Sequence, residues 1–135
     1  MKSSVTLSEN FSSAHFYHQP VWSREKNQTE FGRCFTEHGH GHNYKVEATF
    51  ADLPATALPR VRSALKAVVS EFDHEHLNFI IPEFKAPAPG VPALVPTTEN
   101  IAQLLWERLR PVTEGAVLIK LRLFEMEDLW VEVLP

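Results

Sequence analysis

The chain has 135 residues, of which 44% are hydrophobic and 22% are charged. This length suffices for one domain with a real core but not for two ordinary domains, and the composition excludes a largely disordered chain. The formal net charge of -4 argues against a nucleic-acid partner, because binding to a phosphate backbone requires clustered positive charge. We therefore predict a single domain over residues 1–135.

The cysteine content and the N-terminus indicate the compartment. The single cysteine, Cys34, cannot form an intrachain disulfide, and residues 1–6 lack the long apolar core of a signal peptide. No run approaches the roughly 18 apolar residues that a membrane span requires. The sequence therefore predicts a cytoplasmic protein with no membrane partner.

The first predicted strand runs to a histidine at residue 15. Alternate side chains of a strand share one face, and here that face carries Val5, Leu7, Glu9, Phe11, Ser13 and His15. A histidine at a strand end is more often an ordinary hydrogen-bonded residue than a metal ligand. If this strand pairs antiparallel with the next one, however, His15 arrives beside the histidines of that second strand.

A polar connection is predicted over residues 16–33, and a second strand follows it, ending near Phe50. His40 and His42 share one face of this strand, so their imidazoles can hold one ion. The glycines between and before them, Gly39 and Gly41, place no side chain on the opposite face and permit another backbone or a ligand to approach closely.

Three histidines from two strands predict a metal site with an open position. Four protein ligands are typical of structural zinc, whereas three ligands with an exchangeable fourth position are typical of catalytic zinc. The predicted ligands are His15, His40 and His42. His38 has the same parity and is the alternative ligand, although its place ahead of the strand favours a loop. The competing interpretation is a surface patch that binds metal adventitiously.

Cys34 also has two interpretations. A free cysteine is usually a small buried hydrophobic residue. Beside a zinc ion its thiol would instead have a lowered pKa and would serve as a base or nucleophile at neutral pH. Conditional on the metal, we favour the reactive interpretation.

The next predicted element is a helix that starts near Leu58. It carries an apolar stripe at helical spacing, made of Leu58, Val61, Leu65, Val68 and Phe72, and should lie on a sheet face. The stripe runs into Asp73-His74, an acid beside a histidine, which is typical of a carboxylate-oriented proton carrier. Neighbouring side chains need not touch, so a solvated helix end is an equal alternative.

A proline-rich loop and a second helix follow. Residues 82–96 carry prolines at positions 82, 87, 89, 92 and 96, which exclude regular structure through most of this segment. Thr97-Thr98-Glu99-Asn100 then supplies a hydroxyl N-cap and an acid in the first turn of a helix that stops before Pro111. Capping alone would explain both threonines and the glutamate.

The last predicted element is a hairpin. Val117, Ile119, Leu121 and Leu123 share an apolar face, and Glu125 continues it before the chain turns and returns over residues 129–133. A carboxylate on an apolar face is costly to bury without partners. Glu125 is therefore either exposed at the strand end or paired with a ligand that offers hydrogen-bond donors.

Together these motifs resemble the 6-pyruvoyl-tetrahydropterin synthases and their bacterial relatives, the 6-carboxytetrahydropterin synthases. The resemblance implies an α+β T-fold, in which a four-stranded antiparallel sheet carries two helices on one face. It also implies that subunits join into a trimeric barrel and that trimers stack into a homo-hexamer. The matching pieces occur in family order over nearly the whole chain: Phe11-Ser12-Ser13-Ala14-His15, Phe31-Gly32-Arg33-Cys34, His40-Gly41-His42-Asn43-Tyr44, Asp73-His74 with Leu77-Asn78, Thr97-Thr98-Glu99-Asn100-Ile101-Ala102, and Glu125.

The resemblance implies a role for each site residue. Some relatives carry a glutamate in place of the catalytic cysteine, so Glu37 is a second candidate base. The implied assignments are zinc ligands His15, His40 and His42; catalytic groups Cys34, Asp73, His74 and Glu37; and pterin recognition by Thr97, Thr98, Glu99 and Glu125.

The implied activity is that of a zinc-dependent lyase acting on 7,8-dihydroneopterin triphosphate. We favour 6-carboxy-5,6,7,8-tetrahydropterin as the product because the compact length resembles the bacterial enzymes. The spacing from Cys34 to His40 resembles the pyruvoyl-forming enzymes instead, and cleavage to a hydroxymethylpterin is also open. Whether the product feeds queuosine, biopterin or folate synthesis is open too. The alternative of a different class is a non-catalytic zinc- or pterin-binding module with the same fold.

Overall fold

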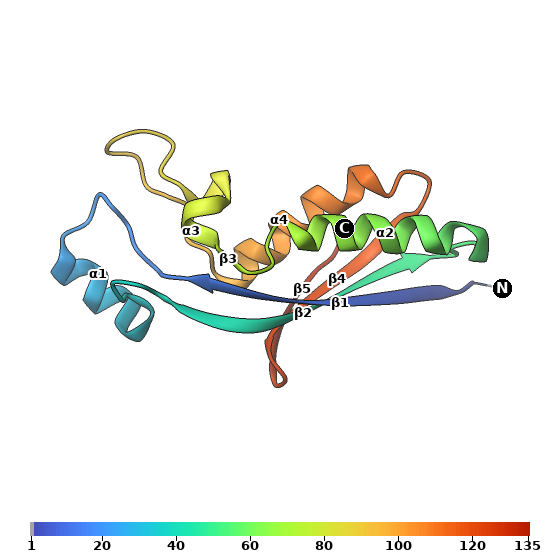
Figure 1. Cartoon of the computed structure of the whole chain (residues 1–135), viewed down its shortest axis with the longest axis horizontal. Helices are drawn as coiled ribbons and strands as arrows, with labels where there is room; N and C mark the ends of the chain where they lie inside the picture. Colours follow the sequence, from blue (N-terminus) through green and yellow to red (C-terminus); the bar gives the residue numbers. More distant parts are fainter. Residues whose placement is uncertain (1) are drawn as a thin grey trace.

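Figure 1 shows the computed structural model of the chain, which describes residues 2–135. One curved sheet forms a layer, and helices cover one of its faces. The strands are β1 (Ser4–His15), β2 (His40–Ala51), β3 (Glu75–His76), β4 (Val117–Met126) and β5 (Leu129–Val133). The α-helices are α1 (Arg24–Phe31), α2 (Leu58–Ser70), α3 (Leu77–Ile80) and α4 (Thr98–Val112), with 3-10 turns at Gly32–Cys34, Ala55–Ala57 and Pro82–Phe84.

The sheet has the strand order β3-β1-β2-β4-β5. The pairs β1–β2, β2–β4 and β4–β5 are all antiparallel, which confirms the predicted four-stranded antiparallel sheet. The two-residue strand β3 adds a parallel edge that the sequence did not predict. The long β1–β2 pairing runs from Ser4 opposite Ala51 to His15 opposite His40, so the ends of these strands bring two histidines together.

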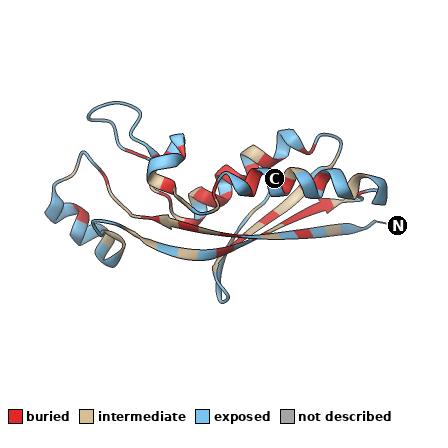
Figure 2. Cartoon of the chain, in the orientation of Figure 1, coloured by how far each residue is buried: buried red, intermediate tan, exposed pale blue. Residues whose placement is uncertain are grey.

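The core lies between the sheet and the helices α2 and α4, which occupy the same face (Figure 1). Figure 2 shows the buried positions concentrated where these helices meet the strands. The predicted stripe of α2 is buried at Val61, Leu65 and Val68, and each such side chain contributes roughly 1.5–3 kcal/mol of hydrophobic stabilisation. Two helices on one face are therefore confirmed. No helix in residues 2–135 combines the length and apolar character needed to cross a membrane.

The connection predicted over residues 16–33 contains a helix, α1, that our sequence analysis missed. The helix has no apolar stripe, so periodicity gave no signal for it. A capping signal was present: the Ser23 hydroxyl accepts a hydrogen bond from the Lys26 amide at 3.1 Å, and Glu25 lies in the first turn. Buried Asn27 then ties the helix to the backbone of Gln19.

The end predicted for α4 was wrong by two residues. The helix includes Pro111 and continues to Val112. A proline in the last turn removes one backbone donor only. Thr113 donates its hydroxyl to the Leu109 carbonyl at 3.0 Å, which satisfies one of the acceptors at the helix end.

The predicted inner face of β4 was wrong at its first residue. Val117 is 60% exposed, whereas Leu118 is buried. The β2–β4 register shifts between Thr49 and Phe50, so that Thr49 faces Lys120 but Phe50 faces Leu118. A bulge of this kind reverses the alternation of side chains on one side of it.

Candidate metal and substrate site

The histidine cluster is formed by the end of β1 and the start of β2. His15, His40 and His42 each offer one ring nitrogen, and these nitrogens all lie within 4.8 Å of one another. The Nε2 atoms of His15 and His40 are 3.3 Å apart. The ring centroid of His42 lies 5.2 Å from that of His15 and 5.0 Å from that of His40. The three predicted ligands are thus brought together.

His15 is held in the form that binds metals. Its Nδ1 lies 3.0 Å from the Pro96 carbonyl oxygen, which can only accept, so Nδ1 carries the proton and Nε2 keeps its lone pair. The Tyr44 hydroxyl lies 3.3 Å from the same Nδ1. Burial, reinforced by His40 and His42, lowers the pKa of His15 to about 4. The imidazole is therefore neutral at neutral pH.

The spacing of the nitrogens fits a tetrahedral ion. Two nitrogens bound at 2.0–2.1 Å in tetrahedral geometry are about 3.3 Å apart. The separation of the Nε2 atoms of His15 and His40 has this value. A three-histidine donor set with a fixed tautomer at His15 can therefore hold a metal ion.

Glu125 lies beside the cluster, where the β4–β5 register shifts between Phe124 and Met126. Its Oε1 is 3.3 Å from the Nε2 of His42, and its side chain is only 14% exposed. Burial lowers the pKa of His42, and the Glu125 charge opposes that effect. The partly buried carboxylate thus has a histidine partner, and it faces the same space as the candidate ligands.

Cys34 ends the 3-10 turn after α1 and is half-buried. Its carbonyl accepts a hydrogen bond from the Tyr17 amide at 2.8 Å. Burial and, after it, the charge of Glu125 raise the pKa of the thiol. The protein groups around Cys34 therefore favour the thiol, and a cation nearby is required for the lowered pKa that we predicted from the sequence.

Glu37 and His38 lie apart from this buried cluster. The carboxylate of Glu37 is 3.9 Å from the Nε2 of His38, and the two side chains are 86% and 89% exposed. The cluster contains His42 and not His38.

Asp73 and His74 form a hydrogen-bonded pair in the turn between α2 and β3, beside Ser12 of β1. The Nδ1 of His74 lies 3.0 Å from the Oδ1 of Asp73, and this oxygen also accepts from the Ser12 amide at 2.9 Å. The Ser12 amide is the main cause of the lowered pKa of Asp73. His74 donates its own amide to the Ser12 carbonyl at 2.6 Å. The two side chains are therefore in contact, and a solvated helix end does not by itself account for this pair.

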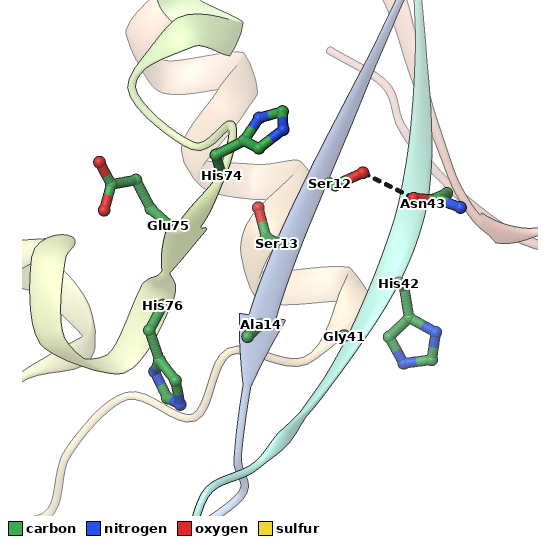
Figure 3. Close-up of a pocket in the computed structure, with 9 residues that line it drawn as sticks. All are labelled: Ser12, Ser13, Ala14, Gly41, His42, Asn43, His74, Glu75 and His76. Atoms are coloured by element: carbon green, nitrogen blue, oxygen red, sulfur yellow. Dashed lines mark hydrogen bonds between the residues drawn. The ribbon is translucent and has the colours of Figure 1, made fainter.

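The orientation of His74 differs from that of the histidine cluster. Its side chain is 84% exposed. His42 and His74 both line an open depression of about 410 Å³. Figure 3 shows their imidazoles pointing in different directions. Within the described residues of one chain, the pair therefore stands apart from the three converging imidazoles.

The start of α4 supplies the remaining predicted residues. The Thr97 hydroxyl accepts from the Asn100 amide at 3.2 Å, so capping accounts for its contact. Thr98 is buried, and Glu99 is exposed. Burial, followed by the charges of Glu125, Cys34 and Glu99, raises the pKa of Tyr17.

Tyr17 and Tyr44 are site residues that our sequence analysis did not assign. The Tyr17 ring lies 5.3 Å from the His15 ring, and burial is the main cause of its raised pKa, followed by Glu125 and Cys34. Tyr44 is buried, and burial followed by Glu125 raises its pKa too. The available signal was parity, because each tyrosine follows a candidate ligand by two residues.

Comparisons with known proteins agree with this geometry. A family model described as 6-pyruvoyl tetrahydropterin synthase matches residues 4–135. Over 126 residues the chain is 34% identical to the 6-pyruvoyl tetrahydrobiopterin synthase of Pongo abelii and 33% identical to that of Homo sapiens. Each alignment covers 88% of this chain and 82% of the relative.

Solved structures share the fold. The 6-pyruvoyl tetrahydropterin synthase of Caenorhabditis elegans aligns with a TM-score of 0.85 at 25% identity, covering 100% of this chain and 96% of that chain. The 6-pyruvoyl tetrahydropterin synthase of Plasmodium falciparum aligns with a TM-score of 0.63 at 15% identity, covering 98% of this chain and 96% of that chain. The fold class expected from the sequence is confirmed.

Proposed function

The chain belongs to the 6-pyruvoyl tetrahydropterin synthase family, and we propose that it is a zinc-dependent lyase acting on 7,8-dihydroneopterin triphosphate. The proposed product is 6-carboxy-5,6,7,8-tetrahydropterin, formed with uptake of water, loss of triphosphate and release of the two outer side-chain carbons as acetaldehyde. The observation that carries the proposal is the convergence of three imidazoles beside the carboxylate of Glu125.

The metal ligands in this proposal are His15, His40 and His42. Their number leaves a coordination position for the substrate, as in catalytic sites. Bound zinc supplies Lewis acidity that polarises the substrate's side-chain hydroxyls and acidifies the neighbouring carbon-bound protons. The hydrogen bond from His15 to the Pro96 carbonyl orients the first ligand.

The pterin ring in this proposal is bound by Glu125, with Thr97, Thr98 and Glu99 at its edge. A carboxylate accepts hydrogen bonds from the pterin amino group and the adjacent ring N–H, and bonds to a charged group are worth about 1.5–3 kcal/mol each. Support comes from the position of Glu125, which is partly buried and reaches the histidine cluster. Thr97 is the weakest member because capping already uses its hydroxyl.

Proton transfer in this proposal uses Cys34 and the Asp73–His74 pair. Cys34 would remove a proton from the substrate, and a cation bound by the histidines would supply the charge that lowers the pKa of its thiol. His74, oriented by Asp73 at 3.0 Å, delivers a proton. Glu37 remains the alternative base. Because His74 is 84% exposed, we assign its action to substrate held by a neighbouring subunit of a trimer or homo-hexamer.

Product analysis tests the proposal directly. The zinc-loaded protein is incubated with 7,8-dihydroneopterin triphosphate, and the pterin is identified by mass spectrometry while released triphosphate is measured. We expect the mass of the carboxy product, its loss in Cys34→Ala, and nearly full activity in Glu37→Ala. Intact substrate with wild-type protein would refute the lyase and leave a binding module of the same fold.

A second candidate is formation of 6-pyruvoyl-tetrahydropterin, without cleavage of the side chain. The relatives from Pongo abelii and Homo sapiens carry that activity in their names, which favours this candidate. The same mass measurement separates the pyruvoyl, carboxy and hydroxymethyl products. Retention of the whole side chain in the product would replace the carboxy assignment and keep the metal site.

A further inference from the structure

His76 lies close to the metal site but has no part in the function proposed above. It ends the short strand β3, where it pairs with Ala14, one residue before His15. The sequence motifs Asp73-His74 and Leu77-Asn78 lie on either side of it but give His76 itself no role. Its position at the edge of β1 places its ring next to the segment that leads into β2.

The His76 ring is fixed on its sides by aromatic neighbours. It stacks on Phe79 with ring centroids 4.3 Å apart, and the Phe16 ring centroid is 5.3 Å away. Its Nε2 lies 3.3 Å from the carbonyl oxygen of His38. Since a carbonyl only accepts, Nε2 carries the proton and donates to His38.

This hydrogen bond acts on the backbone directly before a candidate ligand. His38 and Gly39 precede His40, and Gly39 has a φ of +79°. A Cβ at Gly39 would lie 3.1 Å from the Nε2 of His76 and would overlap the carbonyl of His15. The backbone at Gly39 is therefore confined between β1 and the His76 ring.

The other nitrogen of His76 is not satisfied. Nδ1 is the single buried side-chain nitrogen or oxygen in residues 2–135 that has no hydrogen-bond partner. Burying an unpaired polar atom opposes folding, so an apolar ring would suit this pocket better on stability alone. The bond from Nε2 to the His38 carbonyl is the contact that an apolar ring cannot make.

We propose that His76 is a positioning residue, which holds the His38 carbonyl and thereby sets the backbone from which His40 reaches the metal. The inference rests on the proposed function, because it requires the three-histidine site to bind a divalent cation. Supporting groups behind metal ligands typically change metal affinity by 10–100-fold. His76 would act one step further out, through the backbone.

Metal affinity of the full chain tests this role. Metal-free wild type, His76→Phe and His76→Gln are titrated with Co²⁺ and with Zn²⁺ in competition with a chelator. Phenylalanine keeps the aromatic packing and removes the donor, while the glutamine amide can reach the same carbonyl. We expect His76→Phe to bind about 10-fold more weakly, with an altered Co²⁺ absorption band, and His76→Gln to restore most of the affinity and the band.

Phe79→Leu is the matched control, because it removes the stacked ring and leaves the hydrogen bond. Wild-type affinity is expected for it. Equal affinities for wild type and His76→Phe would overturn the inference alone, as would equal losses in the Phe, Gln and Phe79→Leu variants. Failure of the wild type to bind either ion would remove the proposed function together with this inference.

Urea unfolding of the metal-free proteins separates lost folding from lost affinity. If His76→Phe does not fold, His76→Met takes its place, since its flexible apolar chain fills the same space without a donor. Iodoacetamide labelling of Cys34, the chain's single cysteine, gives a readout without metal. The labelling rate reports how accessible the thiol is in the segment that leads to His38. Faster labelling in His76→Phe (or His76→Met) than in His76→Gln supports the positioning role, and equal rates contradict it.

Discussion

At the scale of single residues, Gly39 is the glycine at which an added Cβ would meet the closest neighbouring atoms. Its φ of +79° lies in the left-handed region, and a side chain there would overlap the His15 carbonyl. Because His15 and His40 flank this contact, a shift at Gly39 moves two candidate ligands at once. Glycine is therefore required both for its left-handed backbone conformation and because a Cβ would overlap the His15 carbonyl.

We predict that Gly39→Ala destabilises the fold and weakens metal binding. The left-handed conformation alone costs roughly 1–2 kcal/mol for alanine, and the overlap adds to this. Urea unfolding and chelator competition measure the two effects. Gly90→Ala is the control, because Gly90 has a φ of +80° with no atom within 4 Å of the added carbon. Equal losses of stability and metal affinity in the two variants would show that the contact between Gly39 and the His15 carbonyl has no effect of its own.

Glu125 is the second residue whose role has a sharp test. We predict that Glu125→Gln lowers kcat/KM by about 10–100-fold, mainly through KM, because an amide cannot accept from both pterin donors. Steady-state kinetics check this, with zinc content measured in parallel. Glu127→Gln, in the exposed turn of the same hairpin, should behave as wild type. A variant at 125 with unchanged KM would contradict the assignment.

At the scale of elements, the proline-rich segment is anchored where it approaches the site. The buried Gln19 side chain donates to the Ala93 carbonyl at 2.8 Å and accepts from the Ala93 amide at 3.0 Å. Three residues later, the Pro96 carbonyl receives the hydrogen bond from His15. A segment that lacks the regular backbone hydrogen bonds of a helix or strand is thus held in place by one side-chain amide.

Gln19→Leu should therefore destabilise the protein by about 1–3 kcal/mol for each backbone group left unsatisfied at Ala93. The urea midpoint reports the change, and metal affinity reports whether Pro96 has moved. Gln103→Leu is a suitable comparison, since Gln103 is exposed on α4 and bonds only to Glu107; it should remain within about 0.5 kcal/mol of wild type. Similar effects in both variants would speak against the anchor.

At the scale of the whole molecule, one arginine joins three segments. Arg108 of α4 bonds to Glu71 at 2.7 Å, next to the end of α2, and to Glu83 of the Pro82–Phe84 turn at 2.8 Å. Burial raises the pKa of Glu83, but the hydrogen bonds and charge of Arg108, together with a hydrogen bond to the backbone of Glu83, outweigh burial and leave the pKa below its usual value. A folded-state pKa below the unfolded one gives stability that is present above the unfolded pKa.

This stability should be lost as the pH falls from about 5 through the lowered pKa of Glu83. We predict that wild type loses more stability than Arg108→Met between pH 7 and pH 3, with a difference below about 1 kcal/mol because the carboxylates are partly solvated. Urea unfolding across this range measures the slopes. If the free energy of unfolding depends on pH in the same way in wild type and Arg108→Met, the ion pair with Glu83 makes no contribution to stability.

The assembly proposed above predicts complementation between inactive subunits. Cys34→Ala and His74→Ala are each expected to lose most activity, because one lacks the base and the other the proton donor. If His74 acts on a neighbour's substrate, unfolding and refolding the two together should recover up to about a quarter of the wild-type activity, since some sites receive both groups. Mixing Cys34→Ala with His42→Ala is the control, and recovery there would contradict shared sites.

Local patterns in the sequence determined most elements of this protein. Alternation predicted β1 and β2, the apolar stripe predicted α2, and the hydroxyl before Glu99 predicted the start of α4. Each signal depends on neighbours within a few residues, so it can be recognised without knowledge of the fold. Helix α1 was not predicted because it has no apolar stripe, although Ser23 is a capping residue at its start.

Tertiary structure alone decided the distances. That His15 faces His40 follows from the register of two strands, and that Val117 faces solvent follows from a bulge in β4, where Ile119 is the extra residue. The contact of His76 with the His38 carbonyl joins segments that no sequence pattern relates. Composition and periodicity specify which face a side chain takes, whereas pairing across the sheet specifies what it meets there.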